Sequence, residues 1–103
     1  MIRAEFFSRD GIPAGFCISG HAGDAGTDIV CAAVSSAAYL TANTATDIVG
    51  AEAGVRVSDG RMSFRVAGKE AAKCRDLLRG LEAHLTALRR QYPEKIDVIH
   101  TEV

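Results

Sequence analysis

The chain has 103 residues, of which 48% are hydrophobic and 24% are charged, and its formal net charge is −1. This length and composition are typical of one globular domain, spanning residues 1–103, whose core needs no disulfide or structural metal. Twelve basic against 13 acidic residues exclude the basic excess that drives non-specific nucleic-acid binding, so we expect no direct binding of nucleic acid.

The N-terminus and the cysteines indicate the compartment. Residues 1–10 contain no apolar run of signal-peptide length, and no stretch of the chain approaches membrane-spanning length. The three cysteines, Cys17, Cys31 and Cys74, form no CxxC pair, which argues against a disulfide framework and a cysteine-rich zinc site. We therefore expect a cytoplasmic protein that associates with no membrane and holds neither a metal nor a cofactor.

The first elements form a hairpin followed by a loop. Bulky residues from Ile2 to Arg9 lead to the turn signal Asp10-Gly11, and Ala14 to Ser19 form the second strand. Three glycines then fall within residues 20–26. Glycine tolerates many backbone conformations, so this segment is predicted to be a flexible loop.

A long helix is predicted next, capped by Thr27 or Asp28 and running to about Val49. Its many small residues would let neighbouring backbone approach closely. The apolar side predicted from helical spacing comprises Ile29, Val30, Ala33, Val34, Ala37, Leu40, Thr41, Thr44 and Ile48.

The second half contains a hairpin and the clearest helix. The dipeptide Asp59-Gly60 between Val55–Ser58 and Met62–Val66 is a strong hairpin signal. From Lys69 to Tyr92, apolar residues recur at helical spacing and predict an amphipathic helix. Its apolar stripe comprises Cys74, Leu77, Leu78, Leu81, Leu85, Leu88 and Tyr92.

The end of the chain completes the predicted fold. Pro93 ends the second helix, and Ile96 to Thr101 form a final strand. The order is therefore ββαββαβ, an α/β sandwich of one mixed, mostly antiparallel sheet and two long helices. A simple antiparallel sheet with both helices on one face is the alternative.

The glycine-rich loop and the following helix start bring together a histidine and a cysteine. A free thiol with a pKa near 8.5 is only about 3% ionised at neutral pH, and lowering that value to about 6 takes roughly 3.4 kcal/mol. Cys31 is predicted in the first helical turn, where the helix dipole contributes about 0.3–1 kcal/mol. The imidazolium of His21 is the obvious source of the remainder, which makes Cys31 and His21 a candidate nucleophile and acid/base pair.

Residues around this pair offer supporting roles. Asp28 lies one turn before Cys31 and could orient His21, although a carboxylate so close would also oppose thiolate formation. Ser35 lies one turn after Cys31, on the same helix face. Amides of the loop and of the helix N-terminus could bind substrate and the oxyanion of a tetrahedral intermediate. The loop positions of this prediction are Gly20, Ala22, Gly23 and Gly26.

Simpler interpretations remain open for the same residues. Cys31 is also compatible with a small packed hydrophobe, the usual role of a lone intracellular cysteine. Asp28 is compatible with a helix cap alone, Ser35 with a small packing residue and His21 with a turn residue. Cys17, in a strand, and Cys74, on the leucine stripe, are predicted to lie in the core.

A family resemblance rests on two segments, Gly20-His21-Ala22-Gly23 and Asp28-Ile29-Val30-Cys31-Ala32-Ala33-Val34-Ser35. Together they resemble the signature of the bacterial ribosomal-processing cysteine protease family, and both hairpins and the leucine-rich helix extend the resemblance along the chain. It implies an endopeptidase that removes a short N-terminal extension from a large-subunit ribosomal protein, cleaving after a hydrophobic, aromatic-ended segment. It also implies a homodimer and a catalytic dyad, here Cys31 and His21.

The sequence thus predicts a thiol endopeptidase with no cofactor. Cys31 attacks the scissile carbonyl, and His21 accepts the thiol proton and then protonates the leaving amine. A non-catalytic, ribosome-associated dimeric interaction domain is the alternative, because a signature of small residues also suits close packing.

Overall fold

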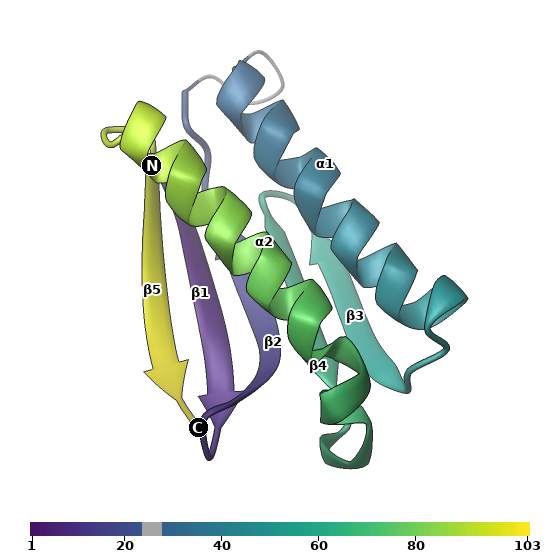
Figure 1. Cartoon of the computed structure of the whole chain (residues 1–103). Coiled ribbons are helices and arrows are strands. Elements are labelled where there is room, and N and C mark those ends of the chain that lie inside the picture. The colour runs from purple at the N-terminus through teal and green to yellow at the C-terminus, as the bar shows by residue number, and fades with distance from the viewer. Residues whose placement is uncertain (24–27) are drawn as a thin grey trace.

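The predicted order of elements, ββαββαβ, is the order found in the structure, a computed structural model that describes residues 1–23 and 28–103 (Figure 1). None of the helices in these ranges is long and apolar enough to cross a membrane. The strands are β1 (Ile2–Arg9), β2 (Ile12–Ser19), β3 (Ala53–Ser58), β4 (Arg61–Val66) and β5 (Ile96–Glu102). The long helices are α1 (Ile29–Asn43), extended by a π-helical turn (Thr44–Ile48), and α2 (Ala71–Gln91), preceded by a 3-10 turn (Gly68–Glu70).

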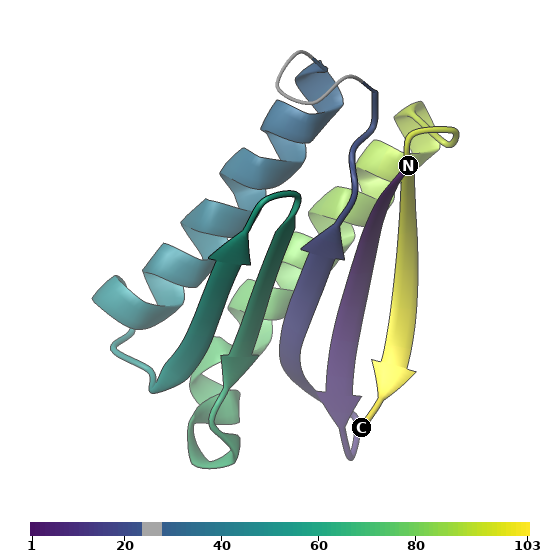
Figure 2. The ribbon, with the colours of Figure 1, turned by 180° about the vertical axis from the view of Figure 1, so that it is seen from behind.

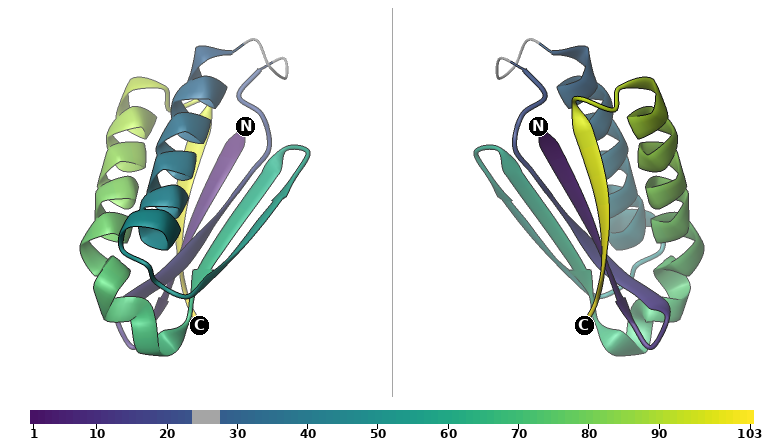
Figure 3. Two further views of the ribbon diagram at one scale, coloured as in Figure 1. Left: turned by 90° about the vertical axis from the view of Figure 1, so that its right-hand side faces the viewer. Right: turned by 90° about the vertical axis from the view of Figure 1, so that its left-hand side faces the viewer.

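The strands form one mixed sheet in the order β3-β4-β2-β1-β5. β1 and β5 are parallel, whereas the other neighbouring pairs are antiparallel. The predicted fold class, one mixed and mostly antiparallel sheet with two long helices, is therefore confirmed. Both helices cover the same face (Figure 3), and the opposite face of the described sheet carries no helix (Figure 2). The structure thus combines the mixed sheet of the main prediction with the one-sided helices of the alternative.

The core lies between the helix layer and the sheet. Phe16 and Phe64, on neighbouring strands, are fully buried and stack with ring centroids 5.5 Å apart. Phe7 in β1 lies on the opposite face of the sheet from this core, because successive side chains of a strand alternate between the two faces. There the Arg65 guanidinium carbon lies 3.8 Å from the centroid of the Phe7 ring. The predicted stripe of α2 is confirmed at its buried positions, which are Cys74, Leu78, Leu81 and Leu85.

The predicted apolar side of α1 is partly wrong. Ile29, Leu40 and Ile48 are 71%, 69% and 80% exposed. Because α1 is rich in alanine and serine, more than one of its faces satisfies helical spacing, and sequence spacing alone does not choose between them. The sheet packs against a face of mostly small side chains, which allows a close approach. The buried residues of α1 are Val30, Val34, Ala38, Thr41 and Ala42.

The ends of several helices and strands meet at one end of the molecule. β1 and β5 begin there, β2 ends there, and α1 begins beside the last turn of α2 (Figure 1). Two backbone hydrogen bonds join these segments: the Ile2 N–H donates to the Lys95 carbonyl (2.8 Å), and the Gly20 N–H donates to the Gly60 carbonyl (3.0 Å). Segments distant in sequence are therefore hydrogen-bonded to one another at this end of the molecule.

Candidate active site

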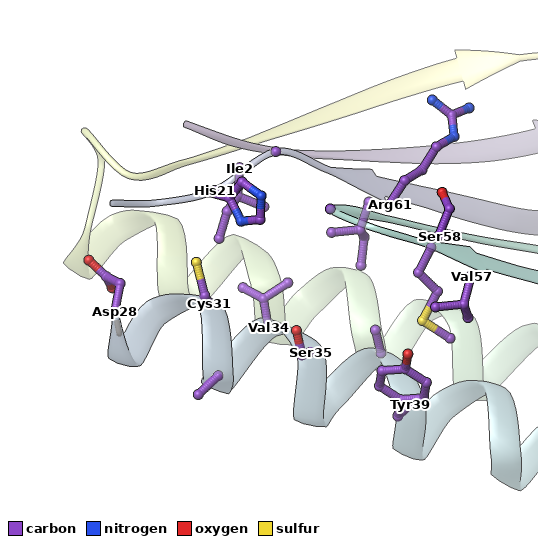
Figure 4. A pocket seen from close by; sticks show the side chains of 16 residues that line it. Ile2, His21, Asp28, Cys31, Val34, Ser35, Tyr39, Val57, Ser58 and Arg61 are labelled. Atoms are coloured by element: carbon purple, nitrogen blue, oxygen red, sulfur yellow. The ribbon is translucent and has the colours of Figure 1, made fainter. Parts of the chain in front are cut away.

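A cavity of about 340 Å³ lies beside the first half of α1 and is lined on its other side by the β3–β4 hairpin and the strand ends. Asp28, Cys31 and Ser35 all line it. Figure 4 shows them along one side of the helix, with His21 across the cavity from Cys31. The structure therefore brings together the two residues predicted as a dyad and the two predicted to support them.

Cys31 combines partial burial with a polar contact. Its Sγ accepts a hydrogen bond from the backbone N–H of Ala22 (3.2 Å), so the glycine-rich loop reaches the thiol directly. Cys17 and Cys74 are buried as predicted, and burial raises the pKa of the Cys74 thiol. Of the three cysteines, Cys31 alone lines the cavity.

His21 is exposed, and its imidazole lies next to the turn between β3 and β4. Gly60 in that turn has a φ of +68°, and a Cβ added there would lie 3.0 Å from Nε2 of His21. The turn is tied to the base of the loop by the Gly20–Gly60 hydrogen bond described above. Sequence reasoning used Asp59-Gly60 only as a hairpin signal, and nothing in the linear pattern connects it with His21.

Asp28 is a helix cap, and its carboxylate is fully engaged. Oδ1 accepts the N–H of Val30 (2.8 Å), and Oδ2 accepts a hydrogen bond from Nζ of Lys95 (2.7 Å). The lysine first, and the Val30 N–H second, hold the pKa of Asp28 below its ordinary value. Among the described contacts neither oxygen bonds to His21, so the predicted orienting role has no support here.

Glycine positions in the loop have separate structural reasons. Gly20 has a φ of +88°, and a Cβ there would clash with the carbonyl oxygen of Met1. A Cβ at Gly23 would lie 2.9 Å from Oδ2 of Asp28, so this glycine leaves room for the capping carboxylate. Gly26 lies outside the described residues. The flexibility of the loop and the roles of its amides in binding stay predictions.

The remaining walls of the cavity were not predicted. Ser35 is exposed and lines the cavity, and its catalytic role stays a prediction. Beyond Ser35 the walls are largely apolar and come from α1, the central strands and the β3–β4 hairpin. Their apolar members are Ile2, Ile18, Ala32, Val34, Ala38, Val57 and Met62, and Tyr39, Ser58 and Arg61 also line the cavity.

The comparison with protein families decides the assignment. Residues 1–97 match the family described as "Cysteine protease Prp". The chain belongs to the cysteine protease Prp family. The resemblance seen in the sequence is thereby confirmed, and the Prp family assignment supports the predicted cysteine protease over the non-catalytic alternative. No curated protein gave a significant match.

Solved structures agree with the Prp family fold. SMU.848 from Streptococcus mutans is 28% identical, with a TM-score of 0.85, and the match covers 100% of this chain and 99% of that one. The essential ribosomal processing protease Prp from S. aureus, with a covalently linked product peptide, is 23% identical. Its TM-score is 0.88, and the match covers 98% of this chain and all of that one. The same protease with a substrate peptide is 22% identical, with a TM-score of 0.87 and the same coverage.

The contact between Gly60 and His21 leads to a prediction for this Prp family member. Gly60→Ala should lower kcat/KM about tenfold, because the new methyl group pushes the imidazole away from Cys31. Alanine at positive φ also costs about 1–2 kcal/mol of stability, so backbone strain needs a control. Gly11→Ala supplies it, because Gly11 also has positive φ (+76°) in a hairpin turn but has nothing within 4 Å of an added Cβ. Equal kcat/KM losses in both variants would show that the His21 contact is irrelevant.

Proposed function

We propose that residues 1–103 form a single cysteine endopeptidase domain whose catalytic dyad is Cys31 and His21. The observation that carries the proposal is the shared cavity, in which Cys31 on α1 faces His21 from the preceding loop. The Ala22 N–H donates a hydrogen bond to Sγ of Cys31, so the loop that carries His21 also contacts the proposed nucleophile. Membership of the Prp family supports the same reaction class.

In the proposed mechanism the dyad works in two stages. His21 accepts the thiol proton, the Cys31 thiolate attacks the scissile carbonyl, and His21 then protonates the amine that leaves. A water molecule that gives a proton to His21 next attacks the thioester, which releases the acyl product and restores the thiol. The loop amides are proposed to stabilise the oxyanion formed in each stage.

The proposed substrate is the N-terminal extension of a large-subunit ribosomal protein, cut after a hydrophobic, aromatic-ended segment in the cytoplasm. The apolar walls of the cavity support the preference, because an aromatic side chain buries about 150–250 Å² when it is enclosed. The similar S. aureus protease is described as a ribosomal processing protease, and it has been solved with a substrate peptide. That description supports the choice of ribosomal protein.

We also propose that the protein is a homodimer. The support is that large apolar side chains are left exposed on α1 and the π-helical turn that follows it, where packing against a second copy would remove them from water. Sedimentation of the full chain would give twice the monomer mass if this is right. These exposed residues are Ile29, Leu40 and Ile48.

Peptides that span the N-termini of large-subunit ribosomal proteins test the proposed function. With mass-spectrometric detection, we expect one cut in a peptide that carries a hydrophobic, aromatic-ended segment, directly after that segment. A matched peptide with aspartate in place of the aromatic residue should be cut at least tenfold more slowly, because a charged side chain loses its hydration in an apolar cavity. Equal cleavage of both peptides would contradict the proposed specificity.

A further inference from the structure

The cap of α1 creates an electrostatic problem for the proposed nucleophile. Asp28 and Cys31 are three residues apart at the helix start, and such neighbours have Cβ atoms about 5–6 Å apart. Asp28 is held ionised by its hydrogen bonds, so an uncompensated charge there would oppose a thiolate on Cys31. The carboxylate nevertheless has a structural role, since Oδ1 caps the helix through Val30.

Lys95 lies on the other side of this carboxylate. Its Nζ is 2.7 Å from Oδ2 of Asp28, and the two side chains are 40% and 12% exposed. Its backbone is also fixed: the Lys95 N–H donates to the Tyr92 carbonyl (3.0 Å), and the Lys95 carbonyl accepts from Ile2 (2.8 Å). A pair that is partly buried and anchored in this way is screened less by salt than an exposed pair.

The positive charge of Lys95 also interacts with the thiol of Cys31. The Asp28 hydrogen bond is the largest cause that raises the pKa of Lys95, and Cys31 contributes a smaller increase. Of the titratable groups near this end, His21, Asp28 and Arg61 line the cavity with Cys31, and Tyr92 interacts with Lys95. In Figure 4 the Arg61 side chain points away from Cys31. Within this set Lys95 is the cation bonded to Asp28.

We propose that Lys95 is a positioning residue of the protease, which neutralises the capping carboxylate of Asp28 so that the start of α1 can both be capped and hold the thiolate of Cys31. The proposal rests on the proposed role of Cys31 as the nucleophile. In this proposal Lys95 is not a catalytic residue, because its side-chain hydrogen bond is to Asp28 and not to Cys31 or His21. It acts through Asp28, and its position depends on the parallel pairing of β1 with β5.

Replacing Lys95 and replacing Asp28 should change the reactivity of Cys31 in opposite directions. This difference distinguishes the proposed role of Lys95 from a merely structural one. Breaking the pair from either side removes the same contact. Lys95→Met, however, leaves a lone negative charge near Cys31, whereas Asp28→Asn leaves a lone positive charge. Asparagine is also a good helix cap, so Asp28→Asn preserves the start of α1. The double variant removes both charges.

The measurement is the rate of Cys31 alkylation by iodoacetamide in the full chain from pH 6 to 9, with the modified cysteine identified by mass spectrometry. At pH 7 we expect Lys95→Met to react about three- to tenfold more slowly than the wild type and Asp28→Asn about two- to threefold faster. The double variant should react within about twofold of the wild type, and the Lys95→Met deficit should disappear at high pH. Lys69→Met is the control, because Lys69 pairs with Glu52 on an exposed surface.

Several results would overturn the proposal. Unchanged alkylation of Lys95→Met, the same direction of change in both single variants, or a double variant as slow as Lys95→Met would each do so. Alkylation of Cys17 or Cys74 would reveal unfolding, and Lys95→Gln then replaces Lys95→Met in the same comparison. Because alkylation needs no substrate, the predicted rate pattern without any peptide cleavage would support Lys95 while contradicting the proposed function.

Discussion

Replacing Cys31 by alanine is expected to abolish peptide cleavage and leave the fold intact. Cys31 is the proposed nucleophile, and no other group can form the thioester when its sulfur is absent. The side chain is only partly buried beside the cavity, so removing one sulfur atom leaves little new void in the core. The measurement is kcat/KM on a cleaved peptide, together with the thermal unfolding midpoint of each protein.

Cys17→Ala is the matched control for this experiment. Cys17 is also a reduced cysteine, but it lies in β2 and does not line the cavity. We expect this variant to keep its activity and to lose a modest amount of stability. Turnover by Cys31→Ala above about a thousandth of the wild-type rate would contradict the assignment of the nucleophile, as would a comparable loss of activity in Cys17→Ala.

The sequence was sufficient to predict the features that depend on local pattern. The order of elements along the chain, both hairpin turns and the buried positions of the α2 stripe follow from spacing and turn residues, and each was confirmed. The pair of His21 and Cys31 could also be proposed from the sequence, because the two residues are only ten positions apart, in a glycine-rich loop and at a helix start. Family resemblance then connected that local pattern with a reaction.

Features that depend on contacts between distant segments could not be predicted. Lys95 is 67 residues from Asp28, and only the parallel pairing of β5 with β1 brings it to the helix cap. Gly60 lies next to His21 at a turn that is hydrogen-bonded to Gly20, 40 residues away in the sequence. The buried face of α1 could not be predicted for a different reason. A helix of small residues shows little difference in hydrophobicity between its faces.

Replacing His21 by alanine is expected to lower kcat/KM by about 10²–10⁴-fold, with the larger loss at acidic pH. The variant loses the group that is proposed to ionise the thiol and to protonate the leaving amine. An unassisted thiol with a pKa near 8.5 is about 0.3% ionised at pH 6 but half ionised at pH 8.5. Raising the pH therefore restores the nucleophile, although it does not restore the proton donor.

The experiment compares kcat/KM of His21→Ala and the wild type at pH 6 and pH 8.5, and the fold-loss should be at least tenfold greater at pH 6. His84→Ala is the control, because His84 is exposed on α2 and does not line the cavity. His21 is itself exposed, so its replacement should change the unfolding midpoint little. An equal loss at both pH values would mean that His21 acts on the leaving amine without setting the amount of thiolate.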